Sequence, residues 1–101
     1  MADERTWTFL SNHGHVLLAV ADDPDARIRD IAERVGITER AAQLIIGDLV
    51  DAGYVTRTRV GRRNSYRIAE HQPFRHPAES GRNVDDLVAI FRRTPAQDST
   101  S

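Results

Sequence analysis

Four stretches of the chain space their apolar residues as on one face of an α-helix. The first stretch predicts a helix that Ser11 or Asn12 caps and that the run Asp22-Asp23-Pro24 ends. Before this helix, the alternation of polar and apolar residues in Thr6-Trp7-Thr8-Phe9 predicts a short extended segment. The apolar positions of the helix are Val16, Leu17, Val20 and Ala21.

The second and third stretches are separated by a short link that contains a glycine. The second predicts a helix over about 28–35, with Gly36 placed as the left-handed residue that ends it. The third predicts a helix over about 39–52, with Thr38 as its N-cap and Gly53 at its end. Two helices joined by three or four residues that include Gly have the spacing of a helix-turn-helix. The apolar face of the second helix consists of Ile28, Ile31, Ala32 and Val35.

The pattern after the third helix is that of two strands. Four of the seven residues in 54–60 are β-branched, and Gly61-Arg62-Arg63-Asn64 predicts a turn. Ser65-Tyr66-Arg67-Ile68 then predicts the returning strand, with Tyr66 and Ile68 toward the core. We therefore expect a β-hairpin with a basic tip.

The chain beyond the hairpin predicts a connector and a fourth helix. Residues 71–80 carry two prolines and no periodicity, which indicates an ordered connector. Asn83 is expected to cap the fourth helix, with two Asp in its first turn and two Arg, Arg92 and Arg93, at its end, as the helix dipole favours. Residues 1–5 and the polar residues 94–101 are expected to be disordered. The apolar stripe of the fourth helix consists of Val84, Leu87, Val88 and Phe91.

Charge is distributed unevenly, although the net charge is only −1. Residues 1–53 hold five Arg and ten Asp or Glu, a net −5, whereas residues 54–82 hold seven Arg and two Glu, a net +5. Residues 83–101 hold two Arg and three Asp, a net −1. A basic block inside an acidic chain indicates a polyanionic partner.

Composition limits the class of protein. A chain of 101 residues, 40% of them hydrophobic and 29% charged, is expected to form one globular domain. It has no Cys, which excludes disulfides, zinc ribbons and Fe–S clusters. No apolar run approaches the ~18 residues of a membrane span, and the acidic start lacks the apolar core of a signal peptide, so a cytoplasmic protein, located at the nucleoid, is expected.

Side chains for catalysis or metal binding do not form a pattern. His13 and His15 diverge on a helix, and Ser11 lacks the orienting acid and oxyanion site of a catalytic triad. No glycine-rich phosphate loop is present. We therefore expect no enzyme activity, no metal and no cofactor.

The order helix, helix, turn, helix, hairpin, helix, over roughly residues 11–69, resembles the winged helix-turn-helix of MarR-like and ArsR-like bacterial transcription regulators. The resemblance implies a mainly α fold with a small β-hairpin (α+β), in which a three-helix core carries a wing and a C-terminal helix. It implies a winged domain over 6–69, a connector over 70–82 and a dimerisation helix over 83–93. The stretches that carry it are Ile31-Ala32-Glu33-Arg34-Val35-Gly36-Ile37-Thr38, Asp48-Leu49-Val50-Asp51-Ala52-Gly53-Tyr54-Val55 and Val60-Gly61-Arg62-Arg63-Asn64.

The same resemblance implies DNA binding, usually as a homodimer, with the third helix in the major groove and the wing on the backbone or in the minor groove. Helical geometry gives the third helix two faces. On the outward face, Arg40 can contact guanine or phosphate and Gln43 can read adenine, while the Thr38 hydroxyl can meet a phosphate. The alternative is a merely solvated face. The outward residues are Arg40, Gln43, Leu44, Gly47 and Asp51, opposite Ala42, Ile45, Ile46, Leu49 and Ala52.

Leu44 and Gly47 are unexpected on a face that reads DNA. An exposed Leu can meet thymine methyl groups, or it can mark contact with a protein. Gly47 costs about 1 kcal/mol relative to Ala inside a helix. It either allows a partner to approach closely or is tolerated without a function.

Further arginines are candidates for phosphate contacts. Arg27 and Arg29 lie at the start of the second helix, where the helix dipole disfavours cations. Contact with a phosphate would explain their position. The alternative is pairing with neighbouring acids, which are Asp22, Asp23, Asp25 and Asp30. In the wing, Arg57 and Arg59 share one face. The tip residues Arg62 and Arg63 are the strongest candidates for phosphate or minor-groove contact, and a solubilising edge hairpin is the alternative.

Apolar residues near both ends of the chain predict a homodimer, because a two-fold axis is the commonest way to bury such surface. Packing of the fourth helix on the first within one chain is the alternative. The residues predicted to form the dimer are Trp7, Phe9, Val84, Leu87, Val88 and Phe91.

The sequence favours a sequence-specific regulator that binds double-stranded DNA, with its recognition helix over about 39–52. The second hypothesis is a winged-helix module that binds proteins and not DNA. The third is a protein that binds RNA mainly through its wing. The sequence identifies neither an operator nor a small-molecule effector.

Overall fold

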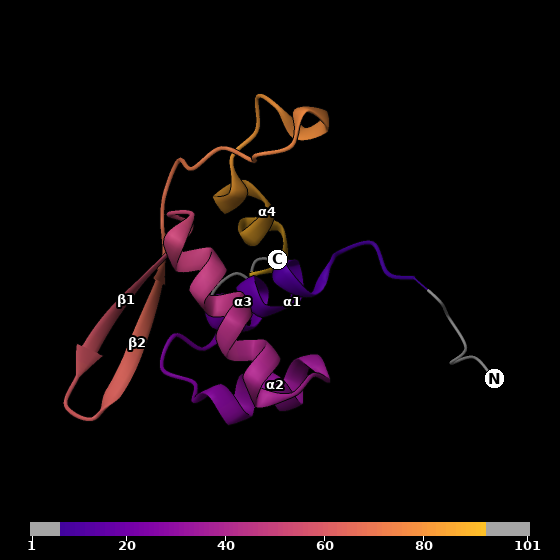
Figure 1. Ribbon diagram of the computed structural model, residues 1–101. Helices are drawn as coiled ribbons and strands as arrows, with labels where there is room; N and C mark the ends of the chain where they lie inside the picture. Colours follow the sequence, from indigo (N-terminus) through magenta and orange to yellow (C-terminus); the bar gives the residue numbers. More distant parts are fainter. Residues whose placement is uncertain (1–6, 93–101) are drawn as a thin grey trace, which may run out of the picture.

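The structure is a computed structural model that describes residues 7–92. The disorder predicted for residues 1–5 and 94–101, and the placement of Thr6 and Arg93, lie outside the described residues. The predicted α+β fold is confirmed: four α-helices surround one core, and a two-stranded antiparallel hairpin projects beside them (Figure 1). The elements are α1 (Asn12–Asp22), α2 (Ile28–Val35), α3 (Glu39–Asp51), β1 (Val55–Val60), β2 (Arg63–Ile68), the 3-10 helix η2 (Pro77–Glu79) and α4 (Val84–Phe91).

Capping residues set the ends of the first three helices. Ser11 caps α1, where its Oγ accepts a hydrogen bond from the Gly14 amide, and the Thr38 hydroxyl caps α3 in the same way. Gly36 ends α2 in the left-handed conformation, with φ +86°. The helix α3 ends one residue earlier than predicted, because Ala52 is its C-cap. Helices α2 and α3 therefore form a helix-turn-helix.

The core lies where α1, α2 and α3 meet, and it is closed by the base of the hairpin and by α4. Ile31 and Ile46 are its largest fully buried side chains. Burial of such a side chain stabilises the fold by roughly 1.5–3 kcal/mol. Figure 1 shows α3 crossing in front of α1, with α2 at its N-terminal end.

The segment before α1, predicted to be extended, contains no strand in its described residues. The chain bends at Phe9 and Leu10, and among the described residues no strand pairs with this segment. Instead, the rings of Trp7 and Phe9 pack edge to face, with centroids 5.2 Å apart. The Thr8 hydroxyl donates a hydrogen bond to the Leu10 carbonyl at 2.6 Å, so local contacts accompany the bend.

The turn of the hairpin is shorter than predicted. Val60 pairs with Arg63, so only Gly61 and Arg62 form the loop, and Arg63 and Asn64 belong to β2. A two-residue loop with Gly at its first position matches the twist of the strands, and Gly61 has φ +66°.

The connector between β2 and α4 is held against the core by polar contacts. The Tyr54 hydroxyl donates a hydrogen bond to the Pro73 carbonyl at 2.8 Å, and the Val84 amide donates to the Gln72 carbonyl at 2.8 Å. Asn83 is the N-cap of α4, as predicted, but it makes no side-chain capping bond, and its backbone forms a bridge with Pro73. These contacts place α4 against α1.

Removal of the Tyr54 hydroxyl is expected to weaken this attachment. Tyr54→Phe should lower the free energy of unfolding by about 1 kcal/mol, since it leaves the Pro73 carbonyl without its donor. Urea denaturation measures the change. Tyr66→Phe is the matched control, because within residues 7–92 the Tyr66 hydroxyl has no hydrogen-bond partner although the side chain is buried. Equal losses for both variants would contradict the expectation.

Candidate nucleic-acid interface

The outward face of α3 is exposed over its first turns. Thr38, Arg40, Gln43 and Leu44 are all exposed, and Leu44 keeps 61% of its surface accessible to solvent. Helix packing produces this face, because the opposite positions fill the core; they are Ala42, Ile45, Ile46 and Leu49, with Ala52 half-buried.

The arginines at the start of α2 point to solvent. Arg27 and Arg29 are exposed, and within residues 7–92 no carboxylate lies within ion-pair distance of either. Asp22, one of the candidate partners of these two arginines, pairs with Arg34 instead. Pairing with the neighbouring acids therefore does not explain why two cations stand at this helix start.

The register of the hairpin divides its arginines between two faces. Arg57 lies opposite Tyr66, on the same face as Arg59, whereas Arg63 lies on the other face. Arg59 Nε donates a hydrogen bond to the Gly61 carbonyl at 3.2 Å. Arg62 is exposed at the tip, which extends away from the helices in Figure 1.

Arg63 also ties the hairpin to the loop between α1 and α2. Its Nη2 donates a hydrogen bond to the Asp25 carbonyl at 3.0 Å, and the Tyr66 amide donates to the Pro24 carbonyl at 2.9 Å. As a result, Arg27, Arg62 and Arg63 line one shallow hollow between α2 and the hairpin. The sequence alone does not connect Arg27 with the wing, because Arg27 and Arg62 are 35 positions apart.

The six residues predicted to form a dimer fall into two groups. Val84 and Val88 are buried in the core of the protomer, with 5% and 1% of their surface exposed, as packing of α4 on α1 requires. Leu87 is half-buried. Trp7, Phe9 and Phe91 are exposed, with 68%, 92% and 49% of their surface accessible.

Ile90, which sequence analysis missed, is 75% exposed. It lies on a different face of α4 from the apolar stripe, so the helical periodicity of apolar residues did not indicate it.

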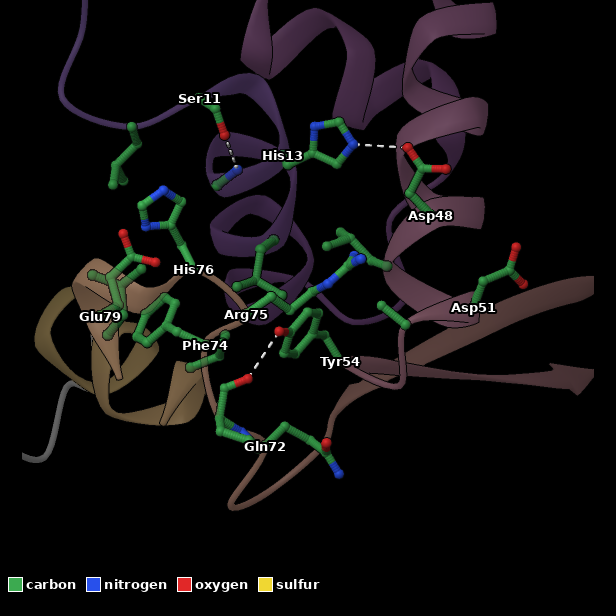
Figure 2. Close-up of a pocket in the computed structure, with 18 of the residues that line it drawn as sticks. Ser11, His13, Asp48, Asp51, Tyr54, Gln72, Phe74, Arg75, His76 and Glu79 are labelled. Carbon is green, nitrogen blue, oxygen red and sulfur yellow. Dashed lines mark hydrogen bonds and ion pairs between the residues drawn. The ribbon is translucent and has the colours of Figure 1, made fainter. Parts of the chain in front are cut away.

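An open groove of ≈ 1420 Å³ lies between α1, the end of α3, the connector and α4. Leu17, Tyr54 and Phe74 are among its apolar lining residues. His13 Nε2 and Asp48 Oδ2 meet at 2.8 Å and join α1 to α3 at the rim of this groove (Figure 2). The sequence did not reveal the groove, because the connector forms one of its walls only after folding.

Residues 7–92 offer neither a metal site nor a membrane span. No three His, Asp or Glu side chains there are grouped so that they could hold a metal ion. In that same part of the chain, no helix has the length and apolar character needed to cross a membrane.

The family model of the MarR family matches residues 8–63, from the segment before α1 to the start of β2. The comparison with curated proteins finds no match.

Proposed function

Because the chain belongs to the MarR family of winged-helix transcription regulators, we propose that it binds a specific site in double-stranded DNA as a homodimer. The observation that supports this proposal is the exposed face at the start of α3, which presents Arg40 and Gln43 beside an arginine-rich hairpin. The major groove of B-DNA admits an α-helix, and Arg and Gln are side chains that recognise guanine and adenine there.

Contacts with the DNA backbone come from two places in this proposal. The Thr38 hydroxyl and the free amides at the start of α3 approach one phosphate, as the positive end of a helix favours. Phosphates next to the groove that α3 enters are bound by the three arginines of the shared hollow, Arg27, Arg62 and Arg63. Arg29 and Arg59, which are near them in the sequence, add further contacts. Such contacts position the protein on DNA, while α3 supplies the specificity.

The homodimer uses the apolar surface that the protomer leaves exposed. Trp7, Phe9, Phe91 and Ile90 are large side chains at the two ends of the described chain, and each has about half or more of its surface in water. Burying them across a two-fold axis gives a closed assembly. Two recognition helices then reach half-sites about 34 Å apart on one face of the DNA.

Selection of bound duplexes from a random library by the full chain tests this function. The expected result is one motif made of two inverted half-sites whose centres lie about 10 base pairs apart. Enrichment of no sequence above the starting library would contradict the proposal. In that case the winged-helix module that binds proteins becomes the favoured function.

The readout by α3 gives a separate prediction. Arg40→Ala or Gln43→Ala is expected to relax the preference at one base pair per half-site, at a cost of about 1–3 kcal/mol. Library selection with each variant measures the change. Arg75→Ala is the matched control, since Arg75 is exposed on the connector and lines the groove at the end of α3, away from its first turns. Motifs identical to that of the unmodified protein would assign the reading face elsewhere.

A further inference from the structure

Nothing in the described part of the fold requires a glycine at position 47. Among residues 7–92, and apart from the neighbouring backbone of α3 itself, no atom would lie within 4 Å of a Cβ atom built at Gly47, so the fold would accept alanine there. Alanine is the better helix former by about 1 kcal/mol. The fold itself explains the other described glycines. A Cβ atom built at Gly14 would lie only 3.2 Å from Leu10 Cβ. The remaining four have positive φ angles: Gly36, Gly53, Gly61 and Gly81.

Leu44 stands next to Gly47 on the outward face of α3. It is the one large apolar side chain of α3 that is exposed, and Arg40 and Gln43 beside it are exposed too. Side chains on a helix lean toward its N-terminus, so a side chain at position 47 would lie over the turn that carries Gln43 and Leu44. The glycine therefore leaves the flank of Leu44 open.

We propose that Leu44 reads a thymine methyl group in the major groove and that Gly47 is the point where the backbone of α3 comes closest to the DNA. This inference rests on the proposed function. The C5-methyl of thymine is the apolar group that a base pair presents in the major groove, and an aliphatic side chain can contact it. Removal of a side chain at position 47 lets the helix move deeper toward the base edges.

The surroundings of Leu44 favour DNA over a protein partner. A protein-docking surface is a contiguous apolar patch of several hundred Å², whereas Leu44 is the one exposed large apolar residue of α3, with the polar side chains of Gln43 before it and Arg40 one turn earlier. The acids beyond Gly47 lie toward the C-terminal end of α3, and Asp48 is held by His13 on α1. The contact of α3 with DNA thus runs from its N-terminal turns, the part of a recognition helix that contacts bases, to Gly47, and it leaves out the acidic C-terminal turn.

Uracil in place of thymine tests the role of Leu44, because uracil lacks only the C5-methyl. With the selected duplex and the full chain, uracil at one position in both half-sites is expected to weaken binding about sixteenfold, or about fourfold per methyl group. Leu44→Ala should bind the thymine duplex more weakly and should no longer distinguish thymine from uracil. Uracil at thymines outside the half-sites is the control and should leave binding unchanged.

Gly47→Ala tests the close approach and separates it from a structural effect. The variant is expected to unfold at a higher urea concentration, because the helix gains an alanine and the structure has room for it. Its affinity for the selected duplex should fall about tenfold or more, since a tight contact is overpacked. A stabilised variant with unchanged affinity would overturn the role of Gly47.

The outcomes separate this inference from the function on which it rests. Specific binding that is equal for thymine and uracil at every position would overturn the role of Leu44 and leave the DNA-binding function intact. Failure to bind any specific duplex would overturn both, and Leu44 would then be assigned to a contact with a protein.

Discussion

Replacement of Trp7 and Phe91 together by Asp is expected to convert the protein from a dimer to a monomer. Both side chains are exposed in the protomer, so Asp leaves its core intact. Across a two-fold interface, each would instead be an unpaired buried carboxylate, which costs several kcal/mol. The affinity for the selected duplex should fall by about 10²–10⁴, because the second half-site is no longer bound intramolecularly.

Light scattering measures the first effect, with an expected mass of twice the 11.4 kDa of the chain for the unmodified protein. Val60→Asp is the matched control, because the exposed fraction of Val60, 61%, lies between those of Trp7 and Phe91. Val60 is on the hairpin, so this variant should leave the dimer mass unchanged. Val84 and Val88 are unsuitable positions, since they are buried in the protomer. A mass of one chain for the unmodified protein at high micromolar concentration would refute the homodimer. A double variant that stays dimeric would refute an interface built from the terminal segments.

The helix-turn-helix could be predicted closely from sequence because local signals define it. The predicted helix over about 28–35 coincides with α2, since Gly36 can adopt the left-handed conformation that ends a helix. Thr38 fixes the start of α3 through its own hydroxyl. The two faces of α3 follow from helical periodicity alone. Where a residue's own chemistry determines the local structure, the sequence pattern is sufficient to predict the ends and faces of a helix.

Features that depend on contacts between distant residues were not predictable in the same way. The hairpin turn is a local exception: Arg63 lies in a strand because Val60 pairs with it across a two-residue loop, and loop length sets the register of a hairpin. The hydrogen bond from Arg63 to Asp25 then brought the start of α2 and the wing together around one hollow. Likewise, burial of Val84 and Val88 depends on where the connector places α4.

This hollow makes the wing the place where salt dependence should arise. Replacement of Arg62 and Arg63 by Ala removes four arginines from a dimer. If each neutralises one phosphate, the slope of log K against log salt should become less steep by about 3.6, at about 0.9 per phosphate. The affinity ratio of unmodified protein to variant should therefore fall by about 150-fold between 50 and 200 mM salt. All sequences should be weakened alike, because phosphates carry no sequence information.

Two further variants separate phosphate contact from structural loss, since Arg63 also holds the Asp25 carbonyl. Arg62→Ala alone leaves that hydrogen bond in place and should change the slope by about 1.8 per dimer. The double variant Arg75→Ala, Arg82→Ala removes the same charge from exposed positions on the connector, at the opposite end of the molecule from the hairpin tip (Figure 1). It should leave the slope nearly unchanged, because charges farther apart than the Debye length of about 8–10 Å are largely screened. An unchanged slope in the wing variants would show that the hairpin arginines do not contact the backbone, and the exposed wing would then serve to keep the sheet edge soluble.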